Sequence, residues 1–416
     1  MLNKCYRDFP EPWSRAERRK WLIMLVAGTT AVYASRTSVP LLIPAIAKER
    51  NWSRTDSGAV LSSFFWGYTL TQVIGGYLAD RIGGQKVILF AAVGWSAVTV
   101  AMPMIIRLVA LDLEFPLVIS ARIAHGAFQG AHFPGMSSLA SKQLSDKDRA
   151  AFFSLATSGS AFGTLLTGLF GSFVLERSNW QSVFFVIGAL CCSWTLLFYY
   201  MCSMDDRCFT PTENAKVPWT TLFRKPAFWS CVFAHACQNN CFFTLLSWLP
   251  TYFHDVFPEA KGWIVNMVPW LFTVPCTLIG KWISERLLSR GFSVTATRKS
   301  VEAICLLSQS IGLLALEQIN SLEGALVCMV LTIGATGFHN SAVVVNPGDL
   351  APKHSGSVFG LMNTVGSIPG FLGVYAAGEI LEKTHSWALV FNVTAAVNIL
   401  GCLLYLKYAS GSPIVQ

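Results

Sequence analysis

The chain has 416 residues, of which 53% are apolar or aromatic and only 13% are charged, whereas charged residues make up roughly a quarter of ordinary soluble domains. Its mean hydropathy is +0.49 and its formal net charge is +8. This composition excludes a soluble enzyme and indicates a chain whose apolar side chains face lipid. The twelve cysteines lie mostly inside apolar runs without metal-ligand spacing, so we interpret them as packing residues.

Apolar runs of about 20 residues, the length of one membrane crossing, recur along the chain. Residues 1–20 are polar and basic and lack the apolar core of a cleaved signal peptide. We therefore predict an all-α membrane protein of twelve transmembrane helices in two pseudo-symmetric six-helix halves. The expected spans are 21–43, 58–79, 87–108, 116–138, 151–175, 180–202, 228–253, 263–283, 301–320, 323–346, 355–379 and 386–409.

The longest polar stretch separates the sixth span from the seventh and divides the chain into two halves of similar length. This layout is typical of transporters built from two structural repeats, although channels and receptors are also helical bundles. The predicted divisions are an N-terminal tail at 1–20, a first half at 21–202, a central loop at 203–227, a second half at 228–409 and a C-terminal tail at 410–416.

The distribution of lysine and arginine predicts the orientation of the chain. The even-numbered loops and both tails hold 22 of these residues, the odd-numbered loops hold 7, and two lie within spans. Because short cytoplasmic loops carry the excess of positive residues, we expect both termini to be cytoplasmic. The sequon Asn51-Trp52-Ser53 then lies on the opposite side, where N-glycosylation could reach Asn51.

The loop after the second span reads GYLADRIGGQK and resembles the signature loop of the major facilitator superfamily, G-x-x-x-D-R-x-G-x-x-K. Its glycines permit a tight turn and close helix approach, and an aspartate at a helix end can pair with arginines. The resemblance implies a gating or structural role for Gly76, Asp80, Arg81, Gly83 and Lys86.

The fourth span is similar to a second signature of that superfamily, an arginine followed by glycines on one helix face. Here the arginine is Arg122, and the glycines are Gly126 and Gly130. Glycines four residues apart let a neighbouring helix approach the backbone, so we interpret these two as packing residues.

The stretch NPGDLAPKHSG, from Asn346 to Gly356, resembles an element of the organic anion and type I phosphate transporter family, solute carrier family 17. It follows the pattern N-x-x-D-[IL]-A-P-x-x-[SA]-G, and the resemblance gives Asp349, Pro352 and Gly356 a gating or structural role. Several other segments look closest to the vesicular nucleotide transporters of that family.

Two ionisable residues stand out inside the spans, Arg36 in the first and Arg122 in the fourth. A charge near the bilayer centre is costly and usually functional, although a long arginine side chain can also snorkel toward the interface. Every acidic residue is expected in a loop or near a span end, so neither arginine has an obvious carboxylate partner. Guanidinium groups bind phosphate and carboxylate oxygens well, and the family resemblance also assigns both arginines to the substrate pathway.

Four further polar or aromatic residues are candidates to contact an anion beside the arginines: Tyr68, Gln129, Gln238 and Asn346. Hydrogen bonding between helices is an equal alternative for the amides. Glutamine stands at 129 and 238, where related glutamate transporters have a glutamate and an arginine. These departures argue against glutamate as the substrate and remove the acid that would couple transport to protons.

We therefore predict a secondary transporter that moves organic anions, foremost purine nucleotides such as ATP, ADP and GTP, from the cytosol into secretory vesicles or lysosomes. Without a coupling ion, the membrane potential would drive uptake by alternating access. The alternatives are a sodium- or proton-coupled phosphate or carboxylate transporter of the same family, at the plasma membrane, and an anion channel or receptor.

No phosphate-binding G-x-x-x-x-G-K-[ST] loop occurs in the sequence, so a nucleotide would be cargo rather than fuel. We expect no enzymatic activity, no cofactor, no metal and no nucleic-acid partner, with activation by chloride left open. The expected partners are a small anionic substrate and the lipid bilayer, and the expected state is a monomer.

Overall fold

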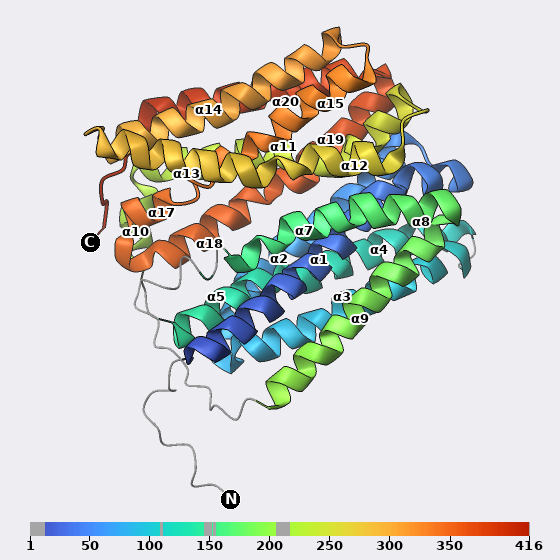
Figure 1. Ribbon diagram of the computed structural model, residues 1–416, viewed down its shortest axis with the longest axis horizontal. Helices are drawn as coiled ribbons and strands as arrows, with labels where there is room; N and C mark the ends of the chain where they lie inside the picture. The colour runs from blue at the N-terminus through green and yellow to red at the C-terminus, as the bar shows by residue number, and fades with distance from the viewer. Residues whose placement is uncertain (1–12, 109–110, 145–151, 153–154, 205–216, 416) are drawn as a thin grey trace, which may run out of the picture.

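The structure, a computed structural model, describes residues 13–108, 111–144, 152, 155–204 and 217–415. This part of the chain is built from helices and contains no strand. The helices form two bundles that lie side by side, one coloured blue to green and the other yellow to red in Figure 1. Each of the twelve predicted spans coincides with one helix or with a run of consecutive helices, which confirms the predicted fold class.

The first half contains six spans. They are α1 (Arg15–Arg50), α2 (Arg54–Ile82), α3 (Gly84–Leu108), α4 and α5 (Leu111–Gly130 and His132–Gln143), the run of α7, the π-helical η1 and α8 (Gly159–Leu166, Thr167–Gly171 and Ser172–Arg177), and α9 (Trp180–Ser203).

The second half follows the short helix α10 (Trp219–Phe223). Its spans are α11 (Pro226–Val256), α12 and α13 (Gly262–Leu271 and Thr273–Ser289), α14 and η2 (Val294–Ala315 and Leu316–Gln318), α15, α16 and α17 (Leu322–Gly334, Thr336–His339 and Asn346–Leu350), η3, α18 and α19 (Pro352–His354, Ser355–Gly366 and Ile368–Thr384), and α20 (Trp387–Tyr408).

Nine helical stretches among the described residues are long and apolar enough to cross a membrane. The three other predicted spans coincide with α2, with α4 and α5, and with α11. These helices carry buried polar side chains such as Gln72, Gln129 and Gln238, which make them less apolar than the rest.

Three of the spans are interrupted at a proline. Pro134 is the third residue of α5, Pro275 is the third residue of α13, and Pro369 is the second residue of α19. Proline has no backbone N–H and its ring clashes with the carbonyl four residues earlier, so the helical hydrogen-bond pattern breaks at the preceding turn. Each interruption divides one membrane-length span into two segments.

The two halves contact each other unevenly along their length. We call the end of the bundle at which α1 begins and α20 ends the terminal end, and the end with the α1–α2 turn the far end (Figure 1). At the far end Arg54 pairs with Asp255 at 2.8 Å, and its backbone N–H donates to Glu382 at 2.7 Å. Nearer the middle, Asn363 Nδ2 donates to Gln72 Oε1 at 2.5 Å.

Among the described residues, no hydrogen bond joins the halves on the terminal side of Gln72 and Asn363. The apolar cores follow the same division. One core spans both halves and includes Phe65 and Phe243, whose ring centroids lie 4.5 Å apart, whereas a second core around Phe228 contains only residues of the second half and its linker. The halves are therefore joined from the far end to mid-length and part toward the terminal end.

Two predictions concern segments between the spans. Residues 205–216 of the predicted central loop lie outside the described residues, and α10 occupies part of the remainder, so the division into domains stays a prediction.

Asn51 caps α1 in the left-handed conformation, with a φ of 55°, and is exposed at the far end. Its glycosylation also stays a prediction.

Candidate substrate-binding site

Glycines bring α2 and α4 into backbone contact. A Cβ atom at Gly126 would collide with the carbonyl oxygen of Phe64, and one at Gly67 would collide with that of Ile123. At Gly130, a Cβ would lie 2.6 Å from the carbonyl oxygen of Tyr68. The packing role predicted for the glycines of the fourth span is confirmed, and this close crossing places the aromatic residues of α2 beside the polar residues of α4.

Arg36 of α1 lies at the centre of this crossing. Its guanidinium carbon is 4.5 Å from the ring centroid of Tyr33, 4.6 Å from that of Tyr68 and 5.0 Å from that of Phe64. Its Nε donates to Gln129 Oε1 at 3.1 Å. Three aromatic faces and one amide therefore hold a guanidinium that is only 3% exposed.

Arg122 lies on the same aromatic ring from α4. Its guanidinium carbon is also 5.0 Å from the centroid of Phe64, so the two guanidinium carbons are separated by at most twice that distance. Arg122 Nε donates to the carbonyl oxygen of Val60 at 3.1 Å, and Nη1 lies 3.3 Å from His125 Nδ1. The structure therefore brings together Arg36, Arg122, Tyr68 and Gln129, four of the six predicted substrate contacts.

Donor groups lie beside both ring nitrogens of His125, Arg122 beside Nδ1 and the amide of Gln129 at 3.1 Å from Nε2. The amide of Gln129 has a separate acceptor in the carbonyl of Val32 at 3.2 Å. Arginine can only donate, so Nδ1 accepts from Arg122 and the proton is on Nε2. Nε2 then donates to Ser35 Oγ at 2.7 Å, Ser35 donates to Thr99 Oγ1 at 2.7 Å, and Thr99 donates to the carbonyl of Trp95. This chain fixes the orientation of Arg122 without supplying a negative charge.

Among the described residues, neither Arg36 nor Arg122 forms an ion pair with a carboxylate. One terminal nitrogen of Arg36, Nη2, is buried and has no hydrogen-bond partner in the same part of the chain. A buried donor without an acceptor is costly, and an anion bound beside the two guanidiniums would satisfy it.

The other two predicted contacts lie in the second half. Gln238 is buried on α11, and its Nε2 has no hydrogen-bond partner among the described residues. Asn346 is not brought to the arginines: its amide donates to the carbonyl of Ser410 at 2.9 Å and its Oδ1 accepts from the hydroxyl of Tyr405. Asn346 thus ties α17 to the end of α20.

The signature loop after α2 forms a tight turn into α3. Gly83 has a φ of 103°, a conformation that favours glycine, and it ends α2. Arg81 is exposed and lies over the ring of Tyr77 at 4.6 Å, and Lys86 is exposed on the first turns of α3. A Cβ at Gly76 would touch Pro134 of α5 at 3.5 Å.

The structure does not describe the side chain of Asp80. Of residue 356 it describes only the helical backbone. In the family element from Asn346 to Gly356, Asp349 Oδ2 accepts from Arg298 Nε at 2.8 Å, and Pro352 begins η3. The aspartate of this element therefore joins α17 to α14 through an ion pair.

One expectation about charge is wrong. The sequence indicated that every acid lies in a loop or near a span end, but α14 begins at Val294 and Glu302 lies more than two turns inside it, fully buried. Its carboxylate accepts from His339 Nδ1 at 3.0 Å. The N-cap Ser293 is the signal that could have placed this helix start earlier and Glu302 inside the bundle.

Comparison with known proteins agrees with this arrangement. The profile of the Major Facilitator Superfamily matches residues 25–374. The human voltage-gated purine nucleotide uniporter SLC17A9 is 39% identical over 412 residues, which cover 97% of this chain and 94% of the relative. The chloroplastic ascorbate transporter of Arabidopsis thaliana is 32% identical over 425 residues, covering 97% of this chain and 77% of that one.

Solved structures show the same fold at low sequence identity. A bacterial homologue of the human lysosomal transporter Spinster has a TM-score of 0.76 at 16% identity, covering 95% of this chain and 98% of the other. The D-xylose–proton symporter has a TM-score of 0.72 at 16% identity, with 94% and 98% covered. The chain is therefore a multi-pass integral membrane protein that belongs to the Major Facilitator Superfamily and, within it, to solute carrier family 17.

Proposed function

We propose that this protein carries purine nucleotides such as ATP, ADP and GTP out of the cytosol into secretory vesicles or lysosomes, driven by the membrane potential. The observation that carries the proposal is the pair of buried guanidiniums of Arg36 and Arg122, which share the ring of Phe64 and have no carboxylate partner among the described residues. The names of the relatives at 39% identity support nucleotide as the substrate.

The chemistry of the site suits a phosphorylated, ring-bearing anion. Guanidinium forks bind phosphate oxygens through two parallel hydrogen bonds, and Arg36 Nη2 is a donor without an acceptor in the described chain. Tyr33 and Tyr68 present aromatic faces next to that guanidinium, and such faces also stack on nucleobases. One small site thus combines donors for phosphate with surfaces for a base.

The direction of transport follows from the contacts between the halves and from the orientation of the chain. If the terminal end faces the cytosol, as the lysine and arginine distribution predicts, the side on which the halves part beyond Gln72 and Asn363 is the cytosolic side, from which a substrate would enter. A nucleotide of charge about −3 to −4 then gains on the order of 7 to 9 kcal/mol per 100 mV on entering a lumen that is positive inside. No second ion is required for accumulation.

We further propose that the protein acts as a monomer, without catalytic activity or cofactor, in the membrane of secretory vesicles or lysosomes. The conformational cycle would alternate the two halves around the fixed arginine site. The same uptake assay, run with and without chloride, tests activation by chloride.

The test is uptake by purified protein in liposomes whose internal potential is set positive with a potassium gradient and valinomycin. We expect saturable accumulation of labelled ATP that rises with the imposed potential and is independent of a pH or sodium gradient. Flux that rises linearly without saturation would indicate a channel. Strict dependence on sodium or protons would favour the coupled phosphate or carboxylate transporter, and transport of those anions in preference to ATP would do the same.

The same assay tests the site. Arg36→Ala and Arg122→Ala should each reduce ATP uptake to background, because each removes a guanidinium that the anion needs. Arg290→Ala, which removes an exposed arginine at the end of α13, is the matched control and should transport normally. Normal transport by either buried-site variant, at equal protein in the membrane, would remove that arginine from the substrate site.

A further inference from the structure

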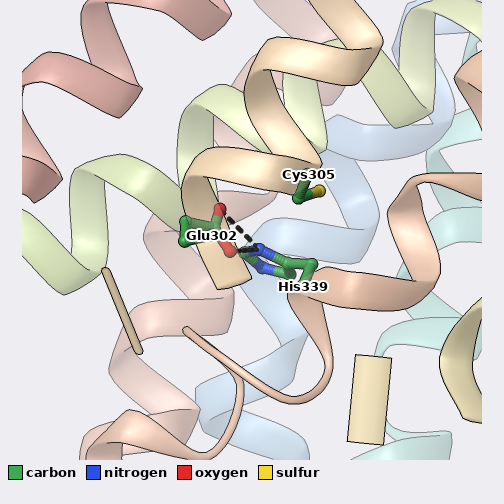
Figure 2. Close-up of side chains that lie close together, drawn as sticks. All are labelled: Glu302, Cys305 and His339. Atoms are coloured by element: carbon green, nitrogen blue, oxygen red, sulfur yellow. Dashed lines mark hydrogen bonds and ion pairs between the residues drawn. The ribbon is translucent and has the colours of Figure 1, made fainter. Parts of the chain in front are cut away.

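A second buried polar cluster lies in the other half of the molecule, remote in sequence from the arginines. Glu302 of α14 and His339 of α16 face each other, and both carboxylate oxygens lie 3.0 Å from His339 Nδ1 (Figure 2). Cys305 follows one turn after Glu302, and no interaction joins its thiol to the pair in Figure 2. Glu302 is 0% exposed and His339 is 3% exposed.

The cluster continues through a second histidine to the boundary between the halves. His339 Nε2 lies 2.9 Å from His235 Nδ1 on α11, and the two rings are nearly parallel, at 14°. His235 Nε2 lies 3.1 Å from Asn239 Nδ2 and 3.5 Å from Asn363 Oδ1. The amide of Asn363 donates in turn to Gln72 of the first half. A chain of polar contacts therefore runs from a buried carboxylate to the interface.

The contact distances assign the protons. Nδ1 of His339 donates to the carboxylate of Glu302, so Nε2 accepts from Nδ1 of His235. Nε2 of His235 is then unprotonated, as its shorter contact with the donor amide of Asn239 requires. Both histidines are neutral in this arrangement, and the cluster carries the single negative charge of Glu302.

The groups around the cluster do not balance that charge. Arg298, one turn before Glu302 on α14, is held by Asp349 through two hydrogen bonds, at 2.8 and 3.3 Å. The charged residues of the neighbouring α13, Lys281, Glu285 and Arg286, are exposed. The packed helices also carry thiols and a phenol that are ordinarily neutral: Cys231, Cys237 and Cys241 on α11, Cys305 on α14, Cys328 on α15, and Cys402 and Tyr405 on α20. Lys299 of α14 is partly exposed.

We propose that Glu302, His339 and His235 form a proton-binding site whose occupancy controls the contact between the two halves at Asn363 and Gln72. A buried net charge is costly, and one proton taken from water brings the net charge of the cluster to zero. The proton adds to His235 Nε2, and the proton on His235 Nδ1 passes to His339 Nε2. The result is an imidazolium on His339 paired with the carboxylate of Glu302.

Binding of this proton changes the hydrogen bond at the interface end of the cluster, because His235 Nε2 turns from an acceptor into a donor. His235 Nε2 becomes a donor, its acceptor is Asn363 Oδ1, and Asn239 keeps its bond to the carbonyl of Gly366 at 3.0 Å. Asn363 is then held from both sides, by His235 and by Gln72. A loaded site therefore stabilises the conformation in which the halves meet at mid-length, and this effect is separate from the substrate site on which the proposed function rests.

The access route is consistent with proton exchange. Exposure rises along the chain from Glu302 through His339 to His235, which is 5% exposed, and Asn363 is half-buried at the interface where the halves part. A proton can thus move from the interface to the carboxylate through two imidazoles without any helix opening.

The test compares the wild type with Glu302→Gln, which keeps the size of the side chain and removes its negative charge. At a fixed membrane potential and with equal pH on both sides, wild-type ATP uptake should fall roughly threefold to tenfold between about pH 8 and pH 5, as the loaded site holds the halves together. Glu302→Gln should show little pH dependence. Glu317→Gln, at an exposed glutamate just beyond the same helix, is the matched control and should retain the wild-type profile.

A second measurement does not require transport. Hydrogen–deuterium exchange of the Asn363 end of α18, compared between wild type and Glu302→Gln at each pH, should show extra protection at low pH in the wild type only, and Asn363→Leu should abolish it by cutting the link to Gln72. Identical pH profiles in wild type and Glu302→Gln by both measurements would overturn the proposal. Stoichiometric zinc in the purified wild type that is absent from Glu302→Gln would overturn it too, by identifying the cluster as a metal site.

Discussion

Phe64 has an unusual place among the residues of the proposed substrate site, because one ring contacts both buried guanidiniums. Its centroid is 5.0 Å from the guanidinium carbon of Arg36 and 5.0 Å from that of Arg122. Two like charges this close repel each other, and the negative face of an aromatic ring offsets part of that repulsion without neutralising either charge. The site can therefore keep two free cations in a buried position until an anion arrives.

Tyr68 allows this role of the aromatic faces to be measured. Tyr68→Leu preserves apolar volume but removes a ring 4.6 Å from the Arg36 guanidinium, so the apparent KM for ATP should rise about fivefold, which corresponds to about 1 kcal/mol. Tyr68→Phe keeps the ring and should stay near the wild-type KM. Concentration-dependent uptake in liposomes measures both, and an equal effect of the two substitutions would instead indicate that the hydroxyl matters.

The two arginines could be predicted from the sequence because each is a single charge in an apolar run. The Glu302–His339 pair could not be predicted in this way. Its members are 37 residues apart and His235 is a further 104 residues from His339, so only the packing of three helices brings them together. The place of Asn346 could not be predicted from the sequence either, because its contacts join α17 to the end of α20.

At the level of helices, the crossing of α2 and α4 sets the geometry of the site. Gly67, Gly126 and Gly130 let two backbones touch, so Phe64 and Tyr68 come within reach of Arg36 and Arg122. The glycine spacing predicted that a helix approaches α4 closely, and the structure shows that this helix is α2. The interruptions of the spans were missed, although Pro134, Pro275 and Pro369 mark them, because apolar length alone does not distinguish one helix from two.

Substitution at the crossing should separate a crowded glycine from an open one. Gly126→Ala places a methyl group against the carbonyl of Phe64, so the helices must move apart at a cost of typically 1–3 kcal/mol, with a lower midpoint of thermal unfolding in detergent. Gly360→Ala on α18, where nothing lies within 4 Å of the new Cβ, should leave the midpoint unchanged or slightly higher. Equal midpoints for the two variants would contradict the close crossing.

At the level of the whole molecule, the structure shows one arrangement of two halves that are joined at the far end. The number of spans and the two-half layout were predictable from composition and hydropathy, since each crossing needs about 20 apolar residues. Which end is closed was not predictable, because the contacts that close it join residues as distant in sequence as Arg54 and Glu382.

The ion pair between Arg54 and Asp255 contributes to closure of the far end. Both side chains are partly exposed, so the pair stabilises this conformation by no more than about 1 kcal/mol. Asp255→Asn should shift the conformational equilibrium up to about fivefold toward opening of the far end. When the far end opens, the halves close at the terminal end, so hydrogen–deuterium exchange on the terminal side of α18 should become slower. The charge-swapped double variant, Arg54→Asp with Asp255→Arg, should restore the hydrogen–deuterium exchange rates of the wild type. No change in Asp255→Asn would exclude a role for this pair in closure.

The unbalanced arginines of the first half also have an electrical consequence. A carrier with two fixed positive charges and no bound anion is itself a charged particle in the membrane field. The loaded site, with a nucleotide of charge about −4, has a net charge of opposite sign to the empty site. Loaded and empty carriers should therefore respond to voltage in opposite directions, and a voltage step applied without nucleotide should produce a brief displacement current that disappears when Arg36 and Arg122 are removed together.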